Sequence, residues 1–475
     1  MENQRSMNEV LKLQREHFLK EGPPSYELRI DRLSRVQDMV IQNKDRITEA
    51  LNADFGTRSQ NQSLISDVYG VLPAFSHAKK HLKSWMKDEK RKSNFPFSLL
   101  GAKSYIHREP LGIIGMISPW NFPMYLSLAP LAGIFSAGNQ VMHKPSEFTP
   151  ITSELLKEIC DSSFDETEFA TFLGGPDVGE SFTKLKFDHL LFTGSGNIGK
   201  HVMRAAADNL VPLTLELGGK SPVIVSDSSN IDITARRVMF NKTLNAGQIC
   251  LAPDYVYVHE TEKDNFVEAC KKQVNNFYSD LKYNPDYTSV INQKHYDRLN
   301  GLLSDAKDHG AEIVEINPAD EDFSQQESHK IPPTLVLNPN DDMQIMKEEI
   351  FGPLLPIKTY TDINEPINYI NKNDKPLGLY YFGNNKSEQS KVVNSTTSGG
   401  VTVNDIMGHI QQNELGFGGV GPSGMGKYDG FDGFMNFSNN KPIYKQISFR
   451  LDKVLDAIRP PYKGSLQGVL EKLLK

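Results

Sequence analysis

The chain has 475 residues, of which 38% are apolar and 23% are charged, a composition typical of soluble globular proteins of two to four domains. Its 52 basic and 59 acidic residues leave a net charge of −7, which argues against nucleic acid and favours a small-molecule partner. Three cysteines without Cys-x-x-Cys spacing exclude a disulfide framework and a cysteine-based metal site. Because residues 1–16 also lack the apolar core of a secretory signal, we expect a cytoplasmic protein.

The N-terminal part of the chain is expected to be helical, because apolar residues recur at helical spacing from Tyr26 to Trp85. A basic stretch then leads to Lys103–His107, which we interpret as an edge strand or an interface segment. The apolar stretch Leu111–Phe135 is long enough to suggest a membrane span, but three prolines and an asparagine interrupt it. We therefore predict buried strand, loop and helix there, and no integral membrane segment.

Short β-rich runs alternate with helical patterns in the next part of the chain. This alternation predicts right-handed βαβ units and a parallel, doubly wound sheet, so the fold class is α/β. The predicted strands are Ile113–Ile117, Gln140–His143, Leu190–Thr193, Pro212–Leu217 and Val223–Val225.

A second series of elements begins near Pro222 and predicts a second α/β domain. Glycine-rich loops near Gly399 and from Gly416 to Gly426 are expected to return the chain across the first domain. The final run, Leu466–Leu474, has helical spacing and is either an interface helix, which we favour, or a weak surface anchor. The elements predicted for the second domain are helix Ile233–Gln248, strand Tyr255–His259, helix Phe266–Val274 and strand Glu312–Ile316.

The segment Gly194–Gly199 has the pattern G-x-G-x-x-G between a predicted strand and a predicted helix. Glycines there let the backbone approach a pyrophosphate, and the N–H groups at the helix start favour the anion. An ordinary βα turn is the alternative, and the two flanking elements favour dinucleotide binding.

Glu216 follows Gly194 by 22 residues (216 − 194 = 22), at the end of the next predicted strand. The dinucleotide fingerprint places an acidic residue at about this spacing to bind the adenosine ribose. Gly218 and Gly219 also open the backbone beside Glu216, which suits a catalytic base. The spacing alone does not choose between these roles.

Cys250 lies where a predicted helix ends near Gly247 and a loop begins. A lone cysteine usually packs as a small hydrophobic residue, as we expect for Cys160 and Cys270 in their helical runs. The loop position of Cys250 favours a nucleophile instead. A helix C-terminus disfavours a thiolate, and no histidine is adjacent in sequence, so activation must come from elsewhere in the fold.

Further candidates for the functional site lie at predicted turns. Asn121, between two prolines, either caps the next helix or donates a hydrogen bond to an oxyanion. Lys144 and Glu147 follow a predicted strand at the carboxyl edge where doubly wound sheets bind ligands, with a solvated turn as the alternative. Glu349 and Phe351 lie in a segment that, taken alone, indicates only a helix-to-strand connection.

Together these blocks occur in one order and resemble the aldehyde dehydrogenase superfamily from about Leu33 to Tyr462. The most specific are Glu-Leu-Gly-Gly-Lys, which begins at Glu216, and the Gly-Gln-Ile-Cys block that ends at Cys250. Four further segments are most similar to the class 3 and coniferyl aldehyde dehydrogenase branch. They are Ser146–Pro150, Leu251–Tyr255, Gly418–Gly426 and Arg459–Tyr462.

The resemblance implies NAD(P)-dependent oxidation of an aliphatic or aromatic aldehyde to the carboxylic acid, through a thiohemiacetal and a thioester on cysteine. By position it implies Cys250 as the nucleophile, Glu216 as the general base and Asn121 as part of the oxyanion hole. Glu147 then takes the place of the fingerprint carboxylate, which leaves Glu216 for chemistry. The implied cofactor-binding residues, with no metal, are Lys144, Glu147, Gly194, Ser195, Gly199, Glu349 and Phe351.

The same resemblance implies the domain organisation and a homodimer. Residues 1–88 and 112–215, with a return near 400–425, are expected to form the NAD(P)-binding domain, and residues 216–399 the catalytic domain. Residues 89–111 and 426–475 are expected to bridge and oligomerise, with Ala102–His107 and Pro442–Leu451 as the bridging elements. NAD is the expected cofactor and NADP the alternative, because Glu147 would repel a 2′-phosphate.

Two positions depart from the family pattern. Gly416 stands where proline is common, and Asp429 stands where class 3 relatives usually have histidine. We expect these changes to affect the substrate entrance rather than the reaction type. Two other functions compete. The first is a dehydrogenase that passes the thioester to coenzyme A, and such enzymes usually lack a base such as Glu216. The second is an inert structural homologue, which would not need Cys250, Glu216 and Asn121 together.

Overall fold

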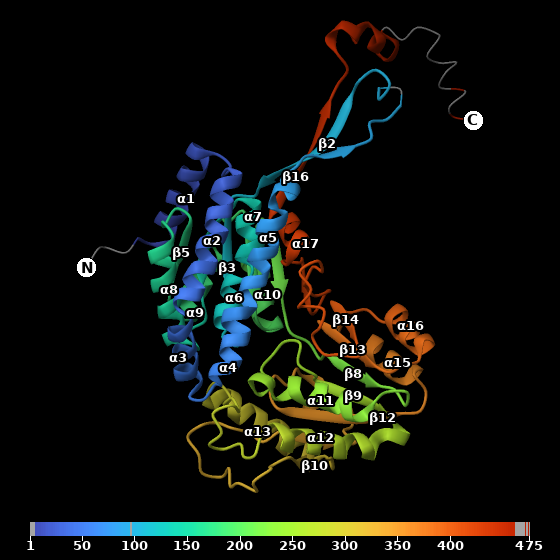
Figure 1. Cartoon of the computed structure of the whole chain (residues 1–475). Coiled ribbons are helices and arrows are strands. Elements are labelled where there is room, and N and C mark those ends of the chain that lie inside the picture. Colours follow the sequence, from blue (N-terminus) through green and yellow to red (C-terminus); the bar gives the residue numbers. More distant parts are fainter. Residues whose placement is uncertain (1–4, 96, 461–470, 472–473, 475) are drawn as a thin grey trace.

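The computed structural model describes residues 5–95, 97–460, 471 and 474, and it shows two sheets flanked by helices and one protruding arm (Figure 1). Within the described residues, no helix combines the length and apolar character needed to cross a membrane. The interrupted stretch Leu111–Phe135 forms buried strand β3 (Ile113–Ile117) and the short buried helices α6 (Pro123–Leu128) and α7 (Leu131–Ala137). The predicted succession of strand, loop and helix is confirmed.

Helices form the N-terminal part, as the periodicity predicts. Ser6 and Ser25 cap the first two helices by accepting backbone N–H groups three residues further on. The second helix buries Leu33, Val36 and Val40 in the main core. The elements are α1 (Met7–Glu21), α2 (Tyr26–Gln42), α3 (Lys44–Phe55), α4 (Gln60–Ser63), a π-helical turn (Leu64–Val68), a 3₁₀ turn (Tyr69–Val71) and α5 (Leu72–Trp85).

A six-stranded sheet follows, parallel except for one edge strand. Its spatial order is β15 (Gly424–Met425), β7 (Leu213–Glu216), β6 (His189–Thr193), β3, β4 (Gln140–Lys144) and β5 (Phe169–Thr171). The connecting helices are α8 (Pro150–Ser163), α9 (Pro176–Thr183) and α10 (Gly196–Ala207). Strand β15 pairs with β7 and sets Gly424 opposite Glu216.

The second sheet has seven strands, of which only β10 is antiparallel to its neighbour. Its order is β10 (Glu312–Glu315), β11 (Thr334–Leu337), β12 (Leu354–Tyr360), β9 (Tyr255–His259), β8 (Pro222–Val225), β13 (Gly378–Phe382) and β14 (Gly400–Val403). Its helices are α11 (Ile231–Thr243), α12 (Lys263–Phe277), α13 (Gln293–Asp308), α14 (Gln344–Lys347), α15 (Asn364–Lys372) and α16 (Lys386–Ser395). The two sheets confirm the α/β class with two parallel-rich units.

The arm is a three-stranded antiparallel sheet that extends away from both other sheets (Figure 1). It consists of β1 (Glu89–Arg91), β2 (Lys103–Pro110) and β16 (Ser438–Lys445), and it is followed by a 3₁₀ segment, Phe449–Ile458. The edge-strand interpretation of Lys103–His107 is wrong, because β2 is the central strand and pairs on both sides. Its second partner, β16, follows helix α17 (Gly430–Asn436) more than 300 residues later. The predicted tail Leu466–Leu474 lies largely outside the described residues.

Candidate active site

The segment that leads to Cys250 contains a turn of left-handed backbone. The helix predicted over Ile233–Gln248 ends at Thr243, and this prediction is therefore wrong at its C-terminal end. Asn245, Ala246 and Gly247 have φ angles of 50°, 51° and 72°, which no α-helix contains. Cys250 therefore lies in a turn beyond the helix, and the expected conflict between its thiolate and a helix C-terminus does not arise.

Amide side chains hold this turn in place. The Nε2 atom of Gln248 donates to the carbonyls of Asn245 at 2.9 Å and Ser289 at 3.0 Å. Its Oε1 atom accepts the N–H of Ile291 at 3.0 Å. Left-handed backbone at a non-glycine residue costs about 1–3 kcal/mol and persists only where the surroundings fix it. The hydrogen bonds of Gln248 provide that fixation two residues before Cys250.

Cys250 differs from the other two cysteines in its exposure. Cys160 in α8 and Cys270 in α12 are fully buried in the main core, as predicted, whereas Cys250 is only partly buried. Burial raises the pKa of the thiol, and the nearby Glu349 and Glu216 raise it further. The backbone amides of Cys250 and Leu251 favour the thiolate and lower the pKa of the thiol, but less strongly. A base or a cation is therefore needed to form the thiolate.

Glu216 ends strand β7 with a buried side chain that is 3% exposed. In the part of the chain that the structure describes, neither of its carboxylate oxygens has a hydrogen-bond partner. Burial holds the pKa of this carboxyl well above its usual range, and the charge of Asp429 adds to the effect. Asp429 therefore lies within electrostatic reach of Glu216. A buried carboxyl without a partner is costly, and proteins keep such groups for chemistry.

Asn121 lies in the connection between β3 and α6. Its Nδ2 atom donates to the carbonyl of Gln248 at 3.1 Å, so its amide lies against the turn that leads to Cys250. The capping alternative is wrong, because the residue at the N-cap of α6 is Phe122, and the first N–H groups of that helix donate to Asp67 and not to Asn121. One amide hydrogen of Asn121 remains for another acceptor.

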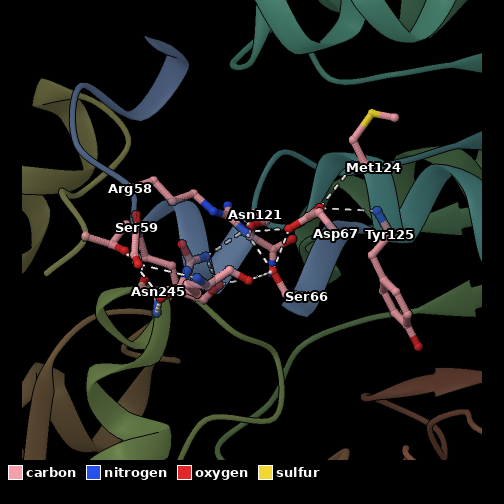
Figure 2. A network of polar contacts seen from close by, with 11 residues as sticks. Arg58, Ser59, Ser66, Asp67, Asn121, Met124, Tyr125 and Asn245 are labelled. Atoms are coloured by element: carbon pink, nitrogen blue, oxygen red, sulfur yellow. Dashed lines mark hydrogen bonds and ion pairs between the residues drawn. The ribbon is translucent and has the colours of Figure 1, made fainter. Parts of the chain in front are cut away.

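A buried ion pair fixes the backbone of Asn121, as Figure 2 shows. Arg58 donates through Nη1 to the Asn121 carbonyl at 2.8 Å and pairs through Nη2 with Asp67 Oδ2 at 2.6 Å. The other oxygen of Asp67 accepts the N–H groups of Met124 and Tyr125, each at 3.2 Å. The side chains of both charged residues are 0% exposed. This pair could not be predicted from local sequence patterns, because Asn121, Met124 and Tyr125, to which it bonds, lie far along the chain.

Replacement of Arg58 by methionine is expected to lower the free energy of unfolding by about 3–5 kcal/mol, because Asp67 is then left as an unpaired buried charge. Urea unfolding followed by circular dichroism measures this change. The double variant Arg58→Met/Asp67→Asn should lose less stability than Arg58→Met, since asparagine keeps an acceptor for Met124 and Tyr125. A double variant as unstable as the single one would contradict this account of the ion pair.

The carboxyl edge of the six-stranded sheet gathers most of the other candidates. Glu216 ends β7 and Lys144 ends β4, while Ser195 follows β6, Asn121 follows β3 and Glu147 follows β4. These strands are parallel neighbours, so their ends meet at one edge, which is where such sheets bind ligands. Cys250 and Glu349 come from connections of the seven-stranded sheet and complete the site.

The turn between β6 and α10 matches the dinucleotide fingerprint in its geometry. The N–H of Gly194 donates to the Glu216 carbonyl at 3.0 Å, and Ser195 is the N-cap of α10. Gly196 faces open space, since a Cβ atom there would meet nothing within 4 Å. Gly199 packs directly against Leu217. The open start of this helix suits an anion.

Lys144 and Glu147 form an ion pair of 2.8 Å. Lys144 is only 3% exposed, whereas Glu147 lies in an exposed turn after β4. Glu349 packs against Gly218 and Gly219, which lie two and three residues after Glu216. Burial and the charge of Asp254 raise the pKa of Glu349 to about 8. Its buried Oε1 atom has no hydrogen-bond partner among the described residues and is able to bind a hydroxyl group.

Phe351 lies two residues beyond Glu349 in the left-handed region, with a φ of 49°. Its ring meets the edge of Trp120 at 5.4 Å between centroids, beside Asn121. The connection that carries Glu349 and Phe351 therefore reaches across to the loop after β3. The structure thus brings Cys250, Glu216, Asn121, Glu349 and Phe351 to one place, where the two sheets meet.

Comparison with known proteins identifies the family. The model of the aldehyde dehydrogenase family matches residues 8–443. The chain belongs to the aldehyde dehydrogenase family. It is therefore an oxidoreductase that oxidises aldehydes, and members of this family use NAD(P).

Three similar proteins illustrate this membership of the aldehyde dehydrogenase family. A probable coniferyl aldehyde dehydrogenase of Caulobacter vibrioides is 51% identical, over 99% of this chain and 97% of its own length. The coniferyl aldehyde dehydrogenase of a Pseudomonas species is 49% identical, over 96% and 94% respectively. The substrate-bound structure of Staphylococcus aureus AldH superposes with a TM-score of 0.92 at 36% identity and covers 99% of this chain and 100% of its own. These relatives confirm the resemblance and the branch inferred from the sequence.

Proposed function

We propose that this aldehyde dehydrogenase oxidises an aromatic aldehyde of the coniferyl type to its carboxylic acid through a thioester on Cys250. The observation that carries the proposal is one arrangement: a partly exposed thiol within electrostatic reach of the unpartnered, buried Glu216, beside the amide of Asn121. The two coniferyl aldehyde dehydrogenases at 51% and 49% identity support the choice of substrate class.

In the first step the Cys250 thiolate attacks the aldehyde carbon, and negative charge develops on the carbonyl oxygen. The remaining hydrogen of the Asn121 amide would donate to that oxygen, together with the backbone N–H of Cys250. Arg58 and Asp67 keep Asn121 rigid, so that no reorganisation is needed as the charge develops.

NAD(P), when bound, supplies the nicotinamide ring that accepts the hydride. Glu216 then removes a proton from water, and the resulting hydroxide attacks the thioester carbon. The carbon–sulfur bond breaks, the carboxylic acid leaves and the Cys250 thiolate is restored. The raised pKa of Glu216 suits this task, because a carboxylate with a pKa nearer neutrality takes up a proton more readily.

Three observations fit NAD(P): the open start of α10, the ion pair between the buried Lys144 and the exposed Glu147, and the unpartnered Oε1 of Glu349. Gly194, Ser195 and Gly199 would form the turn at the pyrophosphate. Lys144 and Glu147 would bind the adenosine ribose, and Glu349 and Phe351 the nicotinamide ribose and ring.

NAD is the proposed cofactor, because the charge of Glu147 would repel a 2′-phosphate. Replacement of Glu147 by glutamine is expected to raise kcat/KM for NADP⁺ relative to NAD⁺ by about tenfold. Initial rates with each cofactor at saturating aldehyde measure the ratio. Glu154→Gln on the neighbouring helix α8 is the charge-matched control, and an unchanged ratio in Glu147→Gln would remove Glu147 from cofactor selection.

We also propose which parts of the chain form each domain. Residues 1–88 and 112–215, with the return near 400–425, would form the NAD(P)-binding domain, and residues 216–399 the catalytic domain. Residues 89–111 and 426–475 would bridge two subunits of a homodimer, with β2 and β16 as the central elements. The arm carries apolar side chains such as Phe95 and Leu99, which are 78% and 79% exposed and are available for burial in such an interface.

Transfer of the thioester to coenzyme A is the competing activity, and the position of Glu216 argues against it. The test is a panel of aliphatic and aromatic aldehydes with NAD⁺ and NADP⁺ and without coenzyme A. Reduced nicotinamide and free acid should form in equal amounts, at the highest kcat/KM with coniferyl-type aldehydes. A folded protein that produced neither, or that required coenzyme A, would contradict the proposal.

A further inference from the structure

A cluster of three metal-binding side chains lies outside the site described above. His77 and His81 are one helical turn apart on α5, and their ring centroids are 4.5 Å apart. Glu414 comes from the segment between β14 and β15 and places its Oε1 atom 3.6 Å from Nε2 of His77. One nitrogen or oxygen atom from each residue lies within 4.8 Å of the other two. Within the described part of the chain, no other group of histidine, cysteine, aspartate and glutamate has this arrangement.

The chemistry of the three side chains suits a divalent transition metal. Two imidazoles and one carboxylate form a common ligand set for zinc, with water in the remaining position.

The positions of the three residues also suit the binding of a metal ion. His77 is mostly buried, with 11% of its side chain exposed, and His81 stacks on the ring of Trp85. The two histidines are therefore held by packing, whereas Glu414, with a side chain 77% exposed, is able to rotate onto an ion. The alternative role of the histidines is purely structural, as part of an aromatic stack on Trp85.

We propose that His77, His81 and Glu414 bind one zinc ion, at a site separate from the catalytic one. The ion would tie α5 to the segment that follows β14. That segment carries Met407 and Ile410, which pack in the same hydrophobic cluster as Cys250. Zinc would therefore restrain the segment between β14 and β15 against α5.

Calorimetric titration with ZnCl₂ tests this site. The protein carries no polyhistidine tag, and all variants are made in a Cys250→Ala background, so that neither a tag nor the catalytic thiol competes for zinc. One ion per chain is expected to bind. His77→Ala and His81→Ala should each weaken the affinity at least about tenfold, and Glu414→Gln should weaken it measurably. His309→Ala, which removes a half-exposed histidine elsewhere, should leave the affinity unchanged.

Two results would overturn the proposal. One is the absence of zinc binding at millimolar ZnCl₂, and the other is binding that His77→Ala and His81→Ala do not alter, which would leave the histidines as an aromatic stack. Because alanine at position 81 also removes packing on Trp85, His81→Gln is measured as well and should weaken zinc binding while keeping the melting temperature. Cobalt(II) gives an independent readout, since ligation by these residues should produce a visible absorption band that both histidine variants lose.

Discussion

Replacement of Cys250 by alanine is expected to lower kcat for aldehyde oxidation by at least about 10⁴-fold, because no other group near Glu216 is able to form the thioester. The cofactor should still bind, since the proposed cofactor contacts come from the edge of the six-stranded sheet and from Glu349 and Phe351. Stopped-flow measurement of reduced nicotinamide gives kcat, and quenching of protein fluorescence by NAD⁺ gives the affinity for the cofactor.

The control for this variant is a cysteine in the core. Cys160 is fully buried in α8, so Cys160→Ala should cost stability by leaving a small cavity while kcat stays close to that of the unaltered enzyme. Substantial oxidation by Cys250→Ala would contradict the assignment of the nucleophile. An equal loss of kcat in the two variants would show that cysteine replacement lowers activity by disturbing the fold.

Replacement of Glu216 by glutamine is expected to slow thioester hydrolysis by about 10²–10⁴-fold while hydride transfer remains much faster. Glutamine has the same shape but cannot accept a proton from water. In a rapid-mixing experiment the variant should therefore release one equivalent of reduced nicotinamide per active site in a burst and then nearly stop. Normal turnover with weakened NAD⁺ binding would instead make Glu216 a ribose ligand.

The pH dependence gives a second measurement on the same residue. Only the ionised carboxylate acts as a base, and burial raises the pKa of Glu216 well above its usual range. Hydrolysis should therefore accelerate as pH rises towards that raised pKa, and Glu216→Gln should lose this rise. Glu312→Gln, which changes an exposed glutamate on β10, should keep the unaltered profile.

Much of the fold follows from local sequence patterns. The apolar runs identified β3, β4, β6 and β7 of the six-stranded sheet and β8, β9 and β10 of the seven-stranded sheet. The G-x-G-x-x-G segment marked the turn between β6 and α10. The errors have physical causes. The role of β2 as a central strand depends on β16, which follows it by more than 300 residues, so no local pattern records the pairing. The helix over Ile233–Gln248 was overextended because polar contacts from Gln248, and not local propensity, stabilise the left-handed backbone at Asn245–Gly247.

The candidate site was less accessible to residue patterns alone. The spacing of Glu216 fitted a ribose ligand as well as a catalytic base, and only the family resemblance distinguished these two roles. What the structure adds is burial without a partner, a property of the packed environment that sequence spacing does not encode. The Arg58–Asp67 pair gave no signal at all, since its hydrogen bonds to Asn121, Met124 and Tyr125 form only when α6 and the turns around it are assembled.

The most direct test of the central claim is intact-mass spectrometry of Glu216→Gln after a single turnover with NAD⁺ and a coniferyl-type aldehyde. The account predicts a mass increase equal to one acyl group, and peptide mapping should place that group on Cys250. An unmodified protein after complete hydride transfer, or an acyl group on any other residue, would contradict it.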